Sequence, residues 1–148
     1  MIDETDPTTP RLVQRFRNFD GALMRLREGI EMVSEDPDVH SIVKEGLIQR
    51  FEFTFELAWK TLKDYLVFRK VTLERSAAAD VIKVAFATGY LKDGETWMDA
   101  LDARNEMSHV YRQQSFERVT EDIQTRFINV IEDLHEMLMM ERARLAGF

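Results

Sequence analysis

The chain has 148 residues, the length of one ordinary domain, with 27 acidic and 20 basic side chains and a net charge of −7. The acidic balance argues against broad, non-specific nucleic-acid binding, because phosphates would repel the protein at long range. There is no cysteine, which excludes a disulfide framework, a thiolate metal site and a cysteine nucleophile. The sequence has neither a membrane-spanning apolar run nor a signal-peptide pattern, so we expect a soluble, cytoplasmic protein.

All three prolines lie in the first quarter of the chain, so the remainder can form long helices. Residues 1–9 are expected to be a flexible leader, and residues 10–148 a single domain. Apolar residues recur at steps of three and four, and they predict helices over about 11–33, 37–70, 77–88 and 95–110, and a last one from 115 onward. The expected N-caps are Asp36, Ser76 and Ser115, and Gly89 is expected to end the third helix. Five helices with short connections predict an all-α, antiparallel up-down bundle around a four-helix core.

The middle of the second helix is apolar on nearly all sides. Its main stripe is expected to face the core and consists of Val43 or Leu47, then Ile48, Phe51, Phe55, Ala58, Leu62 and Leu66. Phe53, Leu57 and Trp59 lie off that stripe, which is typical of a helix at the centre of a bundle or at a subunit interface. Glu56 and Lys60 are spaced to form an i, i+4 ion pair on the polar side.

Polar residues that could take part in catalysis or binding are concentrated in residues 97–111. Arg104, Ser108 and Tyr111 share one face of the fourth helix, and Asn105 and His109 share a neighbouring face. At about 100° per residue, Arg104 and His109 point roughly 140° apart, so one straight helix cannot direct both at a single atom. Three solutions remain open: the arginine bends round, the helix ends near His109, or a second copy supplies the missing group.

These residue types suit cleavage of RNA without a metal ion. A histidine can move a proton to or from a ribose 2′-hydroxyl or a leaving oxygen near neutral pH. An arginine can hold a phosphate and offset charge in the transition state, and Asn105 can orient the imidazole. The other histidines, His40 and His135, are expected to lie on the surface.

Two stretches resemble the nucleotidyltransferase substrate-binding protein family of the HEPN superfamily, which includes HepT-like toxins of toxin–antitoxin pairs. The first is Gln49–Lys63, QRFEFTFELAWKTLK, and the second is AFATGYLKDGETW at 85–97, continuing into RNEMSHVY at 104–111. The resemblance implies an all-helical HEPN-like bundle that forms a homodimer and has a cognate small nucleotidyltransferase as its partner.

The resemblance also implies roles for individual residues. Arg104 and His109 would be the catalytic pair in a cleft between two protomers, with Asn105 and Ser108 as supporting polar residues and no metal or cofactor. Tyr111 would be the site of AMPylation by the partner, which would place negative charge and bulk in the cleft. The tyrosine is followed by Arg112, where relatives often have acidic residues, and this more positive charge favours RNA.

Two functions therefore remain, with a slight preference for the first. The chain is either an endoribonuclease toxin that AMPylation neutralises, or a non-catalytic substrate-binding subunit of a nucleotidyltransferase. A third reading, a plain helical interaction module, is weaker because so many polar residues crowd one short segment. The chain has no phosphate-binding glycine loop, so we do not expect it to transfer nucleotides itself.

Overall fold

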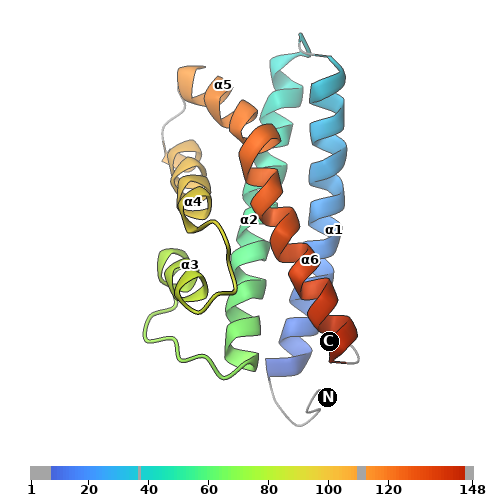
Figure 1. Cartoon of the computed structure of the whole chain (residues 1–148). Helices are drawn as coiled ribbons and strands as arrows, with labels where there is room; N and C mark the ends of the chain where they lie inside the picture. Colours follow the sequence, from blue (N-terminus) through green and yellow to red (C-terminus); the bar gives the residue numbers. More distant parts are fainter. Residues whose placement is uncertain (1–7, 37, 110–112, 146–148) are drawn as a thin grey trace.

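A computed structural model describes residues 8–36, 38–109 and 113–145, without the side chains of residues 8–10, 108–109 and 113–114. The helices are α1 (Thr8–Glu35), α2 (Ser41–Phe68), α3 (Ala78–Ala87), α4 (Gly94–His109), α5 (Gln113–Asp122) and α6 (Ile128–Arg144), with a π-helical segment η1 (Ile123–Phe127) between the last two (Figure 1). Because α5, η1 and α6 follow one another without a break, they count as one long helix. The all-α fold of about five helices is confirmed.

Helix α2 lies at the centre of the bundle. It runs antiparallel beside α1, α6 crosses the pair obliquely, and α3 and α4 lie along the other side of α2 (Figure 1). Leu47 and the six stripe residues that follow it are all buried, none more than 6% exposed, whereas Val43, the alternative first residue, is only partly buried. The periodicity of the sequence therefore predicted correctly which side of α2 faces the core.

Aromatic side chains join α2 to the elements around it. The ring of Phe51 stacks on Phe127 of η1 with centroids 5.4 Å apart, and Phe55 lies 5.8 Å from Trp97 of α4. All four side chains are at most 1% exposed. Such pairs add to the apolar burial that stabilises a core, so they fix the position of α4 against α2.

The first two helices begin at different residues from those expected. Helix α1 begins at Thr8, inside the expected leader, and residues 1–7 lie outside the described residues. Helix α2 begins at Ser41 because Nδ1 of His40 accepts the backbone N–H of Ile42 at 3.1 Å. Asp36 accepts the backbone N–H of Asp38 instead (3.1 Å), so the prediction that Asp36 caps α2 was wrong.

Helices α3 and α4 are joined by a short, well-defined turn. Ala77, not Ser76, precedes α3 and makes no side-chain cap, so that predicted cap was wrong. Gly89 has φ +85°, a left-handed conformation that suits glycine, and it ends α3 as predicted. Asp93 holds the first turn of α4 by accepting the backbone N–H of Thr96 at 3.1 Å and its hydroxyl at 2.7 Å.

The last helix contains a wide turn that periodicity does not reveal. This helix begins at Gln113, so Ser115 lies within its first turn, and the prediction that Ser115 caps the helix was wrong. In and beside η1, side chains donate to backbone carbonyls four positions earlier: Gln124 to Thr120 (3.0 Å) and Thr125 to Glu121 (3.0 Å). These bonds satisfy carbonyls in the region where the helix widens.

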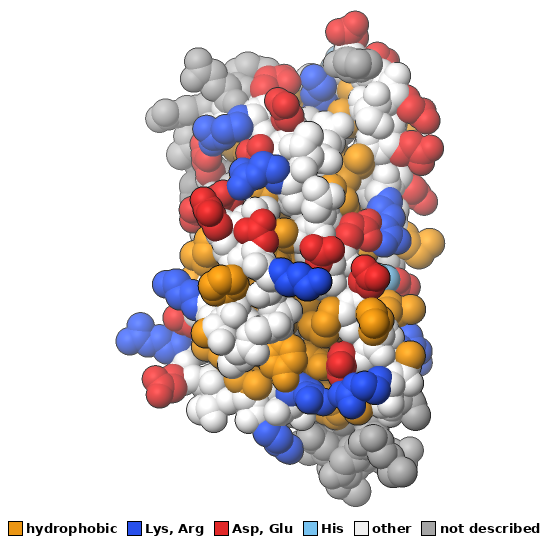
Figure 2. Space-filling model, in the orientation of Figure 1, with side chains coloured by type: hydrophobic (Ala, Val, Ile, Leu, Met, Phe, Trp, Pro, Cys, Tyr) orange, Lys and Arg blue, Asp and Glu red, His pale blue; other side chains and the backbone are white. Residues whose placement is uncertain are grey.

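The α6 face carries mixed charges, with acidic and basic side chains interspersed and apolar ones between them (Figure 2). His135 is not on the surface as expected: its side chain is 12% exposed, it stacks on Phe16, and its Nε2 lies 2.8 Å from Oδ1 of Asp20. His40 is exposed, as expected. None of the helices in the described part of the chain has the length and apolarity needed to span a bilayer.

Candidate functional site between α2 and α4

Arg104 of α4 is bound to α2 through an ion pair. Its Nη2 donates to Oε2 of Glu56 at 2.6 Å, and its Nη1 donates to Oδ1 of Asn105 at 3.2 Å. About a third of each side chain of the Arg104–Glu56 pair is exposed, so the pair lies at the surface and not in the core. The guanidinium is therefore held in place while remaining accessible from solvent.

Glu56 accepts hydrogen bonds from three donors. Besides Arg104, Nε1 of Trp59 donates to Oε2 at 3.0 Å, and Nζ of Lys60 lies 3.1 Å from Oε1, which confirms the predicted i, i+4 pair. Partial burial alone would raise the pKa of Glu56. The hydrogen bonds from Trp59 and Lys60 and the charge of Arg104 outweigh that effect, so its pKa lies below the usual value. Glu56 is thus a carboxylate whose ionised form is stabilised by its hydrogen-bond donors.

Glu52 lies one helical turn before Glu56, and its pKa is shifted in the opposite direction. Burial raises the pKa of Glu52, and the positive charge of Arg104 only partly opposes this. Two carboxyl groups on one helix face therefore have pKa values shifted in opposite directions beside the same arginine. Such divergence is typical of functional sites, although structural ion pairs also produce it.

The other predicted site residues are described to different extents. Asn105 is exposed and contacts Arg104, so these two are brought together. The backbones of Ser108 and His109 belong to the last turn of α4, but their side chains lie outside the described part, and so does all of Tyr111. The geometry of the predicted catalytic pair, Arg104 with His109, therefore stays a prediction.

A second acidic residue fixes the far end of α4. Glu106 accepts the hydroxyl of Ser115, and its Oε2 lies 2.9 Å from Nη2 of Arg118. Both partners belong to α5, so Glu106 joins the two helices on either side of residues 110–112. The position of α5 thereby restrains the end of α4 that carries the histidine.

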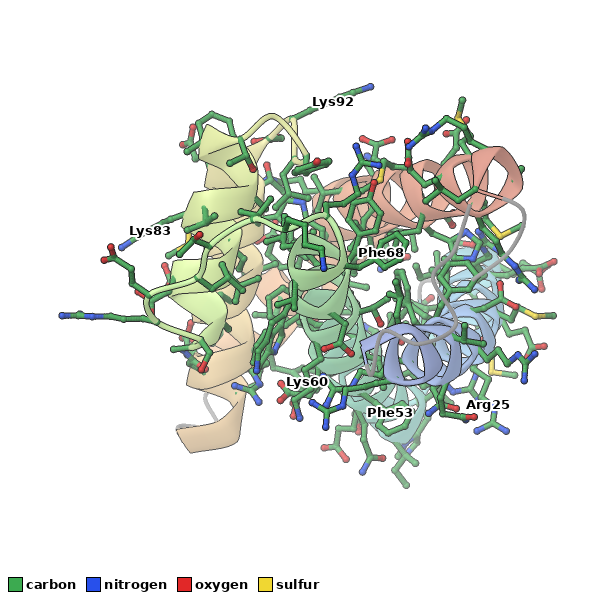
Figure 3. The ribbon with its side chains drawn as sticks, turned by 90° about the horizontal axis from the view of Figure 1, so that it is seen from below. Arg25, Phe53, Lys60, Phe68, Lys83 and Lys92 are labelled. Atoms are coloured by element: carbon green, nitrogen blue, oxygen red, sulfur yellow. The ribbon has the colours of Figure 1, made fainter. Side chains whose placement is uncertain are left out.

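A shallow hollow of about 740 Å³ opens between the first half of α2 and the end of α4. The residues lining it are Ile42, Glu45, Gly46, Ile48, Gln49, Glu52 and Met107. Figure 3 shows Phe53 and Lys60, which lie farther along α2, on the edge of the molecule away from Lys92 and α6. A smaller hollow of about 290 Å³ lies against α6, where Tyr90, Trp97 and Met137 form part of its wall.

Sequence reasoning identified Arg104 but assigned no firm role to the acidic residues opposite it. Glu56 lies 48 positions away along the chain, and only the packing of α4 on α2 brings the two together. The one signal present was a polar line of Glu52, Glu56 and Lys60, spaced by four residues along one face of α2. Because that face is only partly buried, its charged side chains can pair with groups on a neighbouring helix.

The arrangement provides an accessible guanidinium and a carboxylate that orients it. An open hollow, lined by Glu52 and Met107 among others, lies about one helical turn away along each helix. A phosphate can bind such an arginine in a bidentate way once it displaces the carboxylate. The fold and the site together define a class: small all-helical bundles with a charged site where the second and fourth helices meet.

The chain belongs to the family described as nucleotidyltransferase substrate binding protein like, whose sequence model matches residues 14–140. It is also similar to a protein of Haemophilus influenzae described as a probable ribonuclease HepT, with 33% identity over 72 residues. That alignment covers 47% of this chain and 49% of the relative, so the chain matches only about half of the relative's length. These matches support the resemblance to HepT-like HEPN proteins inferred from the sequence.

Proposed function

We propose that this protein is a HEPN-type partner subunit of a small nucleotidyltransferase and that, when released from control, it cleaves RNA. The observation that carries the proposal is the accessible Arg104 guanidinium, which Glu56 holds about one helical turn from the hollow that Glu52 and Met107 line. The likeness to a probable ribonuclease supports it. Because both RNA and ATP are cytoplasmic, we place the pair in the cytoplasm.

In the proposed reaction, His109 removes the proton from a ribose 2′-hydroxyl, and the resulting oxygen attacks the adjacent phosphorus. The bond from phosphorus to the 5′-oxygen breaks, the leaving oxygen takes up a proton from water, and a 2′,3′-cyclic phosphate remains. Arg104 offsets the additional negative charge on the phosphoryl oxygens. Asn105 and Ser108 orient the reacting groups. No step requires a metal ion.

The test uses the purified full-length chain with tRNA and mRNA in buffer containing EDTA. We expect cleavage by the parent, and a loss of at least a hundredfold in Arg104→Ala and in His109→Ala. Arg27→Ala and His40→Ser are matched controls, since Arg27 pairs with Glu132 on another face and serine preserves the cap of α2. If the two site variants cleave as fast as the parent, the proposed reaction is wrong.

AMPylation of Tyr111 is the proposed means of control. The tyrosine hydroxyl attacks the α-phosphorus of ATP bound to the nucleotidyltransferase, pyrophosphate leaves, and the hydroxyl proton passes to a base of that partner. Co-expression with the partner should add the mass of AMP to the chain and abolish cleavage, while Tyr111→Phe should stay unmodified. An unmodified parent chain after co-expression with an active partner would contradict this mechanism.

One observation favours a second function, a non-catalytic substrate-binding subunit. Arg104 is already engaged by Glu56, and the family is described by substrate binding. In that case the hollow binds a small molecule for the nucleotidyltransferase and RNA is not cut. A stable complex with the partner, together with no cleavage and no growth inhibition by the chain alone, would support this second function over the first.

A further inference from the structure

The smaller hollow, which lies against α6, is a second candidate binding site and is separate from the site between α2 and α4. Its volume of about 290 Å³ is close to the lower limit, about 300 Å³, of pockets that bind small molecules. One wall is the turn from Gly89 to Asp93, between α3 and α4, and another wall is a face of α6. No residue of the described chain lines both hollows, so the α6 hollow can bind a ligand independently of the α2–α4 site.

The turn that forms the first wall is held in place by its own hydrogen bonds and by ring packing. The backbone N–H groups of Tyr90 and Leu91 both donate to the carbonyl of Ala85, at 2.8 and 3.2 Å. The ring of Tyr90 packs edge-on against the buried ring of Tyr65, with centroids 5.4 Å apart. The α6 hollow is therefore formed before a ligand arrives, so binding costs little reordering of the chain.

Apolar and aromatic side chains line the inner part of the α6 hollow. Trp97 and Leu91 are no more than 5% exposed, so they lie at its inner side. On the α6 wall, Met137 is half-buried and Met140 is 66% exposed. Methionine side chains are flexible and polarizable, so they adapt to the shape of an apolar group. The inner part of the hollow thus suits the aromatic or aliphatic body of a small molecule.

Carboxylates outnumber cations among the described residues that line the α6 hollow. Asp93, Asp133 and Glu136 are acidic, whereas Lys92 is basic. Hydrogen bonds from the side chain and the backbone of Thr96 hold the pKa of Asp93 below its usual value, so this carboxyl group is ionised at neutral pH. In the described part of the chain, neither Asp133 nor Glu136 forms an ion pair. The hollow therefore presents a net negative charge to a ligand.

The cations nearest to these carboxylates do not neutralise them. Lys92 is exposed, and Figure 3 shows its side chain extending from the turn into the solvent. Arg126 is already engaged, because its Nη2 lies 2.6 Å from Oδ2 of Asp99 and its Nη1 lies 3.9 Å from Oδ2 of Asp122. A positively charged group in the α6 hollow would therefore meet carboxylates without an ionic partner, close to aromatic rings that also attract cations.

We propose that the α6 hollow binds a small organic cation, a protonated amine joined to an aromatic or aliphatic body. The body packs against Trp97 and Met137 in the inner part of the hollow, and the ammonium group lies at the mouth, facing Asp133 and Glu136. Charge complementarity then selects the cation over neutral or anionic molecules of the same shape. This proposal goes beyond the proposed function and does not depend on it.

The first test titrates the full-length chain with four probes and follows the indole N–H signal of Trp97 by NMR, identified with the variant Trp59→Phe. Phenethylamine should bind with a dissociation constant on the order of 1 mM. Its neutral counterpart 2-phenylethanol, its anionic counterpart 3-phenylpropionate, and methylamine, which lacks the ring, should each bind about tenfold more weakly or worse. No binding of phenethylamine, equal binding of 2-phenylethanol, or a shift of the Trp59 signal alone would overturn the proposal.

Charge variants of the lining residues test the role of the carboxylates. Asp133→Asn and Glu136→Gln should each weaken the binding of phenethylamine about threefold, and the two together about tenfold, as expected for exposed charge pairs. Lys92→Gln should tighten binding about threefold, because a repelling charge is removed. Glu121→Gln is the matched control, since Glu121 is exposed on α5 and does not line the α6 hollow. A double variant that binds as tightly as the parent would contradict the proposed position of the ammonium group.

A third test fills the α6 hollow without changing its charge. Met137→Trp places a larger side chain in the hollow and should weaken the binding of phenethylamine at least tenfold. Met139→Trp is the matched control, because Met139 belongs to the same helix and is 43% exposed but does not line the hollow. Equal thermal unfolding midpoints show that both variants fold. If Met137→Trp binds phenethylamine as tightly as Met139→Trp, the ligand does not occupy the α6 hollow and the proposal is wrong.

Discussion

Nη2 of Arg104 lies 2.6 Å from Oε2 of Glu56, so the proposed phosphate-binding arginine is already paired with a carboxylate from another helix. An incoming phosphate must compete with that carboxylate for the same guanidinium. Glu56 therefore has two opposite effects: it fixes the position of Arg104 and it reduces the affinity of the site for anions.

The first prediction concerns this competition. Glu56→Gln should tighten binding of a 2′-O-methyl oligonucleotide about fivefold, the amount expected from an exposed ion pair worth up to ~1 kcal/mol. Fluorescence anisotropy at fixed salt measures the change. Glu132→Gln is the control, because Glu132 pairs with Arg27 on the face formed by α1 and α6. Unchanged or weaker binding by Glu56→Gln would show that Glu56 does not compete with phosphate.

The second prediction concerns acid stability. Because the pKa of Glu56 is lower in the folded chain than its usual value of 4.5, its ionised form stabilises the fold above that pH. This contribution is lost as the pH falls below 4.5 and through the folded-state pKa. The difference in unfolding free energy between the parent and Glu56→Gln should therefore shrink from pH 6 to pH 3 in urea titrations. A difference that stays constant would contradict the ion-pair explanation.

The third prediction concerns Glu52, whose contribution to stability should change with pH in the opposite direction from that of Glu56. Burial raises the pKa of Glu52 above 4.5 in the folded chain, so the fold favours its protonated form. The resulting stabilisation is present below pH 4.5 and is lost as the pH rises through the raised pKa. Glu52→Gln should therefore be more stable than the parent at pH 7, and this advantage should disappear near pH 4. Lower stability of Glu52→Gln at pH 7 would show that Glu52 makes a favourable ionic contact instead.

The fourth prediction concerns the core. Phe51 is fully buried and stacks on Phe127, so Phe51→Ala should lower the free energy of unfolding by about 3–5 kcal/mol through lost burial and a cavity. Phe86→Ala, on an exposed side chain, should cost no more than about 1 kcal/mol. Chemical denaturation of both variants measures the difference. Similar losses in the two would indicate that α2 is not the centre of the core.

The fifth prediction concerns the end of α4. Glu106 joins α4 to Ser115 and Arg118 of α5, so Glu106→Ala should speed amide hydrogen exchange over residues 104–109. Exchange in α1 should not change. Glu95→Ala is the control, since Glu95 lies exposed at the beginning of the same helix. Faster exchange throughout the chain would indicate global destabilisation and not local release of α4.

Much of the fold could be predicted from the sequence because helices are specified locally. The apolar stripe of α2, the end of α3 at Gly89 and the Glu56–Lys60 pair each depend on residues within one or two turns. The beginning of α2 could not be predicted reliably, because two candidates for its cap, Asp36 and His40, lie four residues apart. The wide turn of η1 was also hidden, since one extra residue in a helical turn barely alters the apolar pattern.

The sequence by itself determined that the chain is all-helical, that the middle of α2 is apolar on almost every side, and that Arg104, Asn105 and His109 crowd one short segment. Only the tertiary structure decided which residue faces Arg104, because Glu56 comes from another helix 48 positions earlier. It also decided that Phe53 lies outward, 61% exposed, while Phe51 and Phe55 on the same helix are buried. The physical reason is that the periodicity of the sequence shows only which faces of a helix are apolar. The packing of α1, α4 and α6 against α2 decides which of those faces are buried within the chain.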